Sequence, residues 1–213
     1  MQPVKKRLCG VSCLVVVFKA MEENKFYKLI RDIKSCGLCE NALPCAPRPV
    51  FQFSPDSRVL LIGQAPGIKA HTSGIPWDDK SGERLRLWLQ VSEQEFYDSK
   101  RFAIVPMGLC YPGRGRSGDL PPRKECAPRW LDPIKNLLNQ VQCEIYVGKY
   151  ACDYYFGKNV KLTSLVKDQS LKDSNQIFLP HPSPRNNIWL AKNQWFEKDT
   201  LPKIRKRLMH LIN

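Results

Sequence analysis

Short apolar runs alternate with amphipathic stretches along most of this 213-residue chain. Four short, mostly apolar runs predict buried strands, at residues 59–62, 102–105, 143–147 and 177–179, and the first of them is apolar throughout. Stretches with apolar residues at helical spacing predict helices over about 22–34, 83–90, 124–140 and 196–211, and another that begins at 149. Strands that alternate with helices connect through right-handed crossovers and form a sheet with both faces covered. The pattern therefore predicts an α/β fold, a three-layer α/β/α sandwich around a short, mainly parallel four-stranded sheet.

Two of the predicted strands end in loops rich in glycine or proline. The first strand is followed by GQAPG at 63–67, where two glycines let backbone N–H groups face a ligand. The fourth runs into PHPSPRN at 180–186, and its three prolines predict a stiff, extended loop that continues neither a sheet nor a helix. Ligands of parallel sheets bind beyond the carboxyl ends of the strands, so we expect both loops to border one site.

The charge of the chain points to a polyanionic partner. Its 34 Lys and Arg residues outnumber 20 Asp and Glu residues and give a formal net charge of +14. The hydrophobic content of 43% is ordinary for a globular domain. Such a basic excess favours nucleic acid first and an anionic membrane surface second.

The first twenty residues faintly resemble a signal peptide. Basic residues at 5–7 precede an apolar run, but the run is too short to span a bilayer, and Lys19 stands where a small-residue cleavage site belongs. We interpret residues 1–20 as a dispensable extension and residues 21–213 as a single domain. The expected protein is a cytoplasmic monomer that does not associate with membranes.

Four of the nine cysteines follow a spacing typical of metal sites. Cys36 and Cys39 form a CxxC pair, 70 residues separate Cys39 from Cys110, and 15 separate Cys110 from Cys126. Without a secretory context, metal ligation is expected rather than a disulfide framework. Four thiolates from two distant segments suit a tetrahedral zinc ion or a [4Fe–4S] cluster, and the alternative is four unrelated buried thiols.

Together, the GQAPG and HPSPRN loops resemble the two signature motifs of the uracil-DNA glycosylase superfamily, over nearly the whole chain after Met21. HPSPRN and the stretch Gly74-Ile-Pro-Trp77 are most similar to the single-strand-selective branch. The cysteine spacing and the following Trp130-Leu131 resemble instead the iron–sulfur branches, families 4 and 5. That resemblance implies a structural [4Fe–4S] cluster, with zinc as the alternative.

The resemblance implies a monofunctional DNA glycosylase that removes uracil or another deaminated base from single- or double-stranded DNA after base flipping. Cleavage of such a bond passes through an oxocarbenium-like sugar while negative charge flows onto the departing base. His181 would donate a hydrogen bond to the base oxygen as that charge develops. Trp77 would stack on the flipped base, although core packing is an equal alternative for it.

The implied contacts fall into two groups. The substrate-binding residues are Gly63, Gln64, Ala65, Pro66, Gly67, Trp77, Ser183 and Asn186, with the backbone N–H groups near Gln64 and Ala65 aimed at the base oxygen. The DNA-binding residues are Pro182, Pro184, Arg185, Arg114 and Arg116, with Arg123 as a further candidate. Each arginine has solvated surface charge as its alternative.

Two positions depart from the family pattern. The superfamily often places an Asp or Asn in the first motif to orient the attacking water, and this chain has Ala65 there. We assign that role to Asp79, with Asp78 behind it, because Asp79-Lys-Ser-Gly82 is similar to the Asp-x-Ser-Gly segment of one iron–sulfur branch. A helix N-cap is the alternative for Asp79.

The second departure concerns recognition of the base. The iron–sulfur relatives carry an Asn shortly before the third cysteine to read the uracil edge, whereas Pro106 lies in that segment here. A backbone group, Gln64 or Asn186 could read the edge, or the substrate could be a different deaminated base. A DNA-binding protein that has lost turnover and a zinc-stabilised hydrolase of small molecules are the competing interpretations.

Overall fold

The computed structural model describes residues 24–169 and 175–212. The chain divides into two compact units, Met1–Ser35 and Cys36–Asn213. The described part of the first unit contains a helix over residues 24–34, as the helical spacing of its apolar residues predicted. The predicted extension at 1–20 lies outside the described residues, and its dispensability stays a prediction. All the predicted site residues belong to the second unit.

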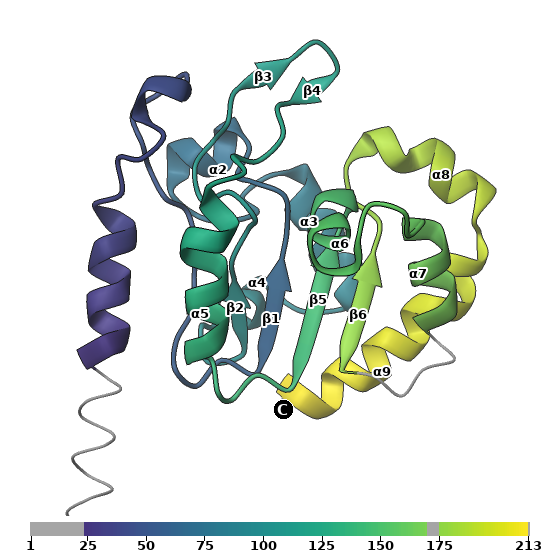
Figure 1. Ribbon diagram of the computed structural model, residues 1–213. Helices are drawn as coiled ribbons and strands as arrows, with labels where there is room; N and C mark the ends of the chain where they lie inside the picture. The colour runs from purple at the N-terminus through teal and green to yellow at the C-terminus, as the bar shows by residue number, and fades with distance from the viewer. Residues whose placement is uncertain (1–23, 170–174, 213) are drawn as a thin grey trace, which may run out of the picture. The chain divides into compact units, whose positions relative to one another are not determined.

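The second unit is built on a four-stranded parallel sheet in the order β2-β1-β5-β6. Its strands are β1 (Val59–Ile62), β2 (Phe102–Ile104), β5 (Cys143–Val147) and β6 (Gln176–Leu179). Figure 1 shows helices on both faces of this sheet. All four residues of β1 are buried, which explains why its sequence is continuously apolar rather than alternating. The predicted α/β/α architecture is confirmed.

Eight α-helices are assigned within the described part of this unit. They are α2 (Ile68–Ser73), α3 (Lys80–Leu89), α4 (Glu93–Phe96), α5 (Asp132–Leu137), α6 (Lys149–Phe156), α7 (Leu162–Asp168), α8 (Asn187–Lys192) and α9 (Leu201–Ile212). A short 3-10 turn, η1 (Glu40–Ala42), follows the CxxC pair. No helix in the described ranges is long and apolar enough to cross a membrane.

Two helices begin or end at other residues than the sequence predicted. The helix predicted over 124–140 begins with a π-helical turn, η2 (Ala127–Leu131), continues as α5 and stops at Leu137. Pro128 and Pro133 lack the N–H that a regular α-helical ladder needs, which accounts for the irregular start. The helix predicted over 196–211 likewise opens with a π-helical turn, η5 (Phe196–Thr200), before α9.

The prediction that residues 180–186 form only an extended loop is wrong. Pro184–Asn186 forms a 3-10 turn, η4, that leads directly into α8. Proline is compatible with the first position of a helix, where its missing N–H would have no intrahelical partner. The prolines therefore set the start of a helix as well as stiffening the strand end.

A β-hairpin lies within the segment between Cys110 and Pro122, which was predicted to be loop. Strands β3 (Arg114–Gly115) and β4 (Gly118–Asp119) pair antiparallel, with Arg114 opposite Asp119. Figure 1 shows this hairpin projecting beyond the carboxyl ends of the sheet strands. The hairpin therefore stands on the edge where the candidate site was predicted.

Gln169 completes the outer edge of the sheet at β6. Its side-chain amide donates to the carbonyl oxygen of Phe178 at 2.8 Å and accepts from the N–H of Phe178 at 2.7 Å. One amide side chain thus takes the place of a fifth strand for this residue. This pairing holds the strand that leads into the HPSPRN loop.

Candidate active site

A cavity of about 670 Å³ opens at the carboxyl ends of β1, β5 and β6. This volume lies within the roughly 300–1,000 Å³ typical of small-molecule sites. The predicted site residues that line it are Gly63, Gln64, Ala65, Pro66, Gly67, Trp77, Asp79, His181, Ser183, Pro184, Arg185 and Asn186. The two motifs therefore meet at one pocket, although β5 separates β1 from β6 in the sheet.

His181 is held between its own loop and the end of β5. The side-chain amide of Asn186 donates to the His181 carbonyl oxygen at 2.6 Å and closes the loop. Gly148 lies against the imidazole, because a Cβ placed on it would be 3.5 Å from His181 Cδ2, and its φ of +83° is one that side chains rarely allow. The backbone of His181 is thus held by Asn186 and its ring lies against Gly148.

The electrostatic surroundings keep His181 neutral. Burial lowers the pKa of His181 to about 4; Asp79 opposes this shift and Arg185 adds to it. At neutral pH, the imidazole carries one N–H and no charge. A neutral ring can donate a hydrogen bond to a developing anion without first having to lose a proton.

Trp77 lies over the first motif in an unusual backbone conformation. Its φ is +58°, in the left-handed region that non-glycine residues seldom occupy. A Cβ on Gly63 would come within 2.8 Å of the indole, and one on Gly82 within 1.8 Å of the Trp77 carbonyl oxygen. The indole centroid lies 5.5 Å from that of His181, at an interplanar angle of 36°. Glycines on two elements therefore make room for Trp77 at the pocket wall, and its stacking on a base stays a prediction.

The Asp79 side chain caps a helix and also reaches the pocket, so its position is compatible with both roles that the sequence left open. Its Oδ1 accepts a hydrogen bond from the Gly82 N–H at 2.8 Å, which makes it the N-cap of α3. Its Oδ2 lies on the side of Gly67, at the pocket. Capping uses one carboxylate oxygen and leaves the other available, so a role in orienting water stays a prediction. Asp78 does not line this cavity.

Arg185 contacts the β3–β4 hairpin. A Cβ on Gly118 would lie only 1.6 Å from the Nη1 atom of Arg185, so the guanidinium occupies the space that a side chain would need. On the other side of the pocket, the Gln64 amide donates to the Leu120 carbonyl oxygen at 3.3 Å. The hairpin is therefore linked to both motif loops.

The remaining predicted DNA contacts do not line the cavity. Pro182 is buried, while Arg114 and Arg116 are exposed on the projecting hairpin. Arg123 lies beside the cysteines, where it pairs with Glu125 at 3.2 Å. Of these three arginines, only the two on the hairpin are exposed at the pocket edge of the sheet.

Three charged or aromatic residues of the pocket were not foreseen from the sequence. Asp119 lines the cavity from β4, and Lys149 and Tyr150 line it from the start of α6. The last two follow β5 directly, so the rule that ligands bind at strand ends could have found them. Nothing in the sequence pattern indicated the hairpin that carries Asp119.

A sequence model of the uracil DNA glycosylase superfamily matches residues 50–205. The chain belongs to this superfamily. Its members are DNA glycosylases, which act on DNA, and the match includes both motif loops, Trp77, Asp79 and the hairpin. The match is to the superfamily as a whole, so the branch resemblances stay predictions.

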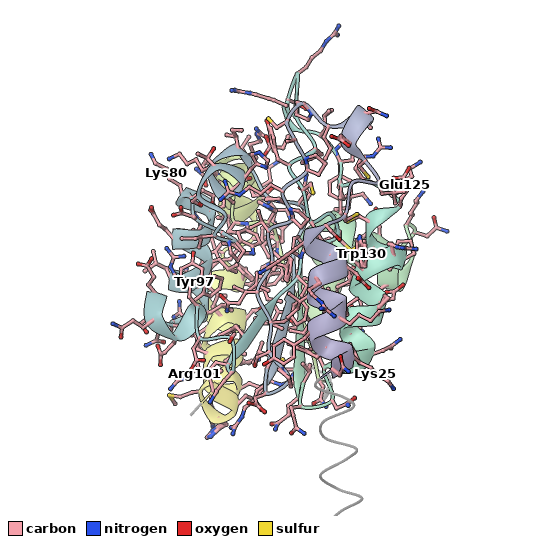
Figure 2. All side chains as sticks on the ribbon, turned by 90° about the vertical axis from the view of Figure 1, so that its left-hand side faces the viewer. Lys25, Lys80, Tyr97, Arg101, Glu125 and Trp130 are labelled. Carbon is pink, nitrogen blue, oxygen red and sulfur yellow. The ribbon has the colours of Figure 1, made fainter. Side chains whose placement is uncertain are left out.

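In this superfamily member, the four spaced cysteines line one narrow cavity together with Trp130. The Trp130 indole N–H donates to Cys36 Sγ at 3.3 Å, and the Leu109 N–H donates to Cys126 Sγ at 3.3 Å. Figure 2 shows Trp130 and Glu125 on the opposite side of this unit from Tyr97 and Arg101. Four thiols from two distant segments are therefore gathered at one place.

Two of the four thiols, Cys110 and Cys126, are protonated at neutral pH. Burial raises the pKa of Cys110 to about 11 and that of Cys126 to about 12. Among the described residues, no group of three or more Cys, His, Asp or Glu side chains is arranged to hold a metal ion. Cys45, Cys143 and Cys152 do not line this cavity, and Cys143 and Cys152 are buried. The donor set fits a metal centre in its chemistry, and both the presence and the identity of such a centre stay predictions.

Proposed function

We propose that this protein is a monofunctional DNA glycosylase that hydrolyses the N-glycosidic bond of uracil or another deaminated base in DNA. The observation that carries the proposal is the convergence of neutral His181, Trp77 and Asp79 on one pocket at the sheet edge. Superfamily membership supports the reaction class.

The reaction needs three actions that these residues can supply. As the bond breaks, the electron pair moves onto the base, and the His181 N–H stabilises the anion that forms. Asp79 Oδ2 orients a water toward the positively charged sugar. The Trp77 indole offers an aromatic face to the extruded base.

DNA binding is supported by the charge around the pocket. Arg114, Arg116, Arg185 and Lys149 are all exposed, and the formal net charge of the chain is +14. Contacts from such side chains to phosphates position the duplex or single strand without reading its sequence. Tyr150, which is 40% exposed at the pocket, adds an aromatic surface on which a neighbouring base can stack.

We also propose that Cys36, Cys39, Cys110 and Cys126 hold a [4Fe–4S] cluster, with zinc as the alternative. A cationic centre would supply the charge that lets the raised-pKa thiols ionise, and it would tie the segment that carries the hairpin to the CxxC pair. The purified protein should show broad visible absorption and contain iron. A colourless protein that contains zinc would establish the alternative.

Base excision is tested directly on labelled oligonucleotides. Single- and double-stranded substrates that carry uracil, hypoxanthine or xanthine are incubated with the protein, and abasic sites are then cleaved with alkali. Scission at one or more of these bases is the expected result, and an oligonucleotide without a deaminated base is the control. Salt-dependent binding without scission on any substrate would favour a DNA-binding protein that lacks turnover.

A further inference from the structure

The β3–β4 hairpin brings a second carboxylate into the pocket. A Cβ placed on Gly67 would lie 3.3 Å from Asp119 Oδ2 and 3.8 Å from Asp79 Oδ2. Both side chains line the same cavity. Two carboxylate oxygens from different elements therefore face the same small region beside the first motif.

Both carboxylates are carried by fixed parts of the fold. Asp79 is held through its other oxygen by the Gly82 N–H. Asp119 pairs with Arg114 in the hairpin ladder, and the next residue, Leu120, bonds through its N–H to the Gly113 carbonyl oxygen at 2.8 Å. The side chain of Gln64 bonds to the other side of Leu120. The position of Asp119 is thus set by the same motif loop that forms the pocket.

The surroundings of Asp119 make it a stronger base than an ordinary aspartate, and burial is the main cause. Burial raises the pKa of its carboxyl; Arg185 and Arg114 oppose the shift, and Asp79 adds to it. The charge of Asp119 also acts on Tyr111, whose pKa is raised by burial and by Asp119. Repulsion from the Asp79 carboxylate is relieved when Asp119 gains a proton.

We propose that Asp119 acts with Asp79 to hold the attacking water and to accept its proton, an inference that rests on the function proposed above. The water donates one hydrogen to each Oδ2 atom and turns a lone pair toward the sugar carbon. As the bond from that carbon to the base breaks, its electron pair leaves with the base, and the water oxygen bonds to the carbon. The proton that the water loses passes to Asp119. Two negative charges near an oxocarbenium-like sugar also stabilise it.

The alternative is that Asp119 serves only to hold Arg185 for DNA contact. The guanidinium packs on Gly118, next to Asp119 in the chain, and its positive charge lowers the pKa of Asp119. The two roles predict different effects of replacing Asp119. A water-holding carboxylate affects the rate on bound substrate, whereas a support for Arg185 affects the affinity for DNA.

The test compares Asp119→Asn with wild type and with Asp56→Asn, an exposed aspartate that does not line the cavity. The wild-type reaction is measured first, on the best substrate of the oligonucleotide panel. Single-turnover rates at saturating enzyme are recorded from pH 4.5 to 8.5, and affinity is measured by fluorescence anisotropy on a non-cleavable 2′-fluoro analogue. Melting temperatures report folding, and Asp119→Ser is the second variant if Asp119→Asn does not fold.

We expect Asp119→Asn to lower the single-turnover rate by roughly tenfold to a hundredfold, as loss of a proton acceptor does. Affinity should stay within about threefold of wild type, since no predicted DNA contact is removed. The acidic limb of the rate profile should move to lower pH, because the carboxyl with the raised pKa is gone. Asp56→Asn should match wild type in all three measurements.

Three results would overturn the inference. An unchanged rate and pH profile in Asp119→Asn would remove Asp119 from the chemistry. A loss of affinity with an unchanged rate at saturation would assign it to the support of Arg185. If wild type cleaves none of the substrates, both the proposed function and this inference are overturned. This outcome differs from the other two because it is seen with wild type, before any variant is made.

Discussion

The neutrality of His181 has a consequence for stability that can be measured without any substrate. Burial lowers the pKa of this histidine to about 4 in the folded protein, with Asp79 opposing the shift and Arg185 adding to it. In the unfolded chain, the pKa returns to the ordinary value of about 6.5. Between about pH 4 and pH 6.5, the His181 side chain binds a proton in the unfolded state but not in the folded state. Stability therefore falls as the pH drops from about 6.5 toward about 4.

The size of this loss follows from the two pKa values. Between pH 7.5 and 4.5, proton binding to the unfolded chain should cost the fold about 2–3 kcal/mol through His181 alone. Replacing the ring with an uncharged side chain of similar polarity, as in His181→Asn, removes this contribution. The variant is expected to be less stable than wild type at pH 7.5 because it loses packing against Gly148, and the difference should shrink at pH 4.5.

Urea denaturation of both proteins at pH 7.5 and 4.5 provides the measurement. Other titrating groups are common to the two proteins, so the change in the difference between them isolates His181. His210→Asn, at an exposed position on α9, shows what the removal of a histidine outside the pocket does. Parallel pH dependence in wild type and His181→Asn would refute the assignment of a desolvated, neutral imidazole.

Three further predictions concern the supports of the site. Asp79→Asn should keep the helix cap, because Asn caps about as well as Asp, but it should slow base release. Asp79→Ala should slow base release and also lower stability by about 1 kcal/mol. Equal rates in Asp79→Asn and wild type would show that Asp79 serves only as a helix cap. Gly148→Ala should lower stability by about 1–3 kcal/mol and reduce turnover, because φ is +83° and the new Cβ would lie 3.3 Å from His181. The control Gly157→Ala, where φ is +90° and the surrounding space is open, should lower stability without affecting turnover. Gln169→Ala should lower the free energy of unfolding, measured by urea denaturation, by about 1–3 kcal/mol, because the buried N–H and C=O of Phe178 lose their partner. An unchanged denaturation midpoint would contradict this prediction.

Local pattern determined the sheet of this protein. Each strand is a short, mostly apolar run. The strand β1, which is buried along its whole length, is apolar throughout, whereas Glu144 in β5 is a charged exception and is only partly buried. The alternation with helices then required parallel pairing. Because parallel strands end at a common edge, the sequence also indicated that GQAPG and HPSPRN would meet, and both line one pocket.

Helix ends were less well determined because their causes are not periodic. The cap at Asp79 moves the start of α3 to Lys80. The prolines at 128 and 133 account for the π-helical turn that precedes α5. At Pro184, the same residue type begins a helix instead of preventing one. Proline is compatible with one helical position and not with most others, so its effect depends on where the chain turns.

Tertiary structure alone placed Asp119 at the pocket. Asp79 and Asp119 are 40 positions apart, and no spacing rule links them. They meet because a hairpin of four paired residues folds back over Gly67, and that hairpin is held by side chains of both motif loops. The pKa of His181 is likewise a property of its burial and of Asp79 and Arg185, which come from separate segments. The sequence by itself thus determined where a site would form, because strand ends follow from local pattern. Long-range packing decided its chemistry, because charge and proton affinity depend on neighbours that the chain order does not reveal.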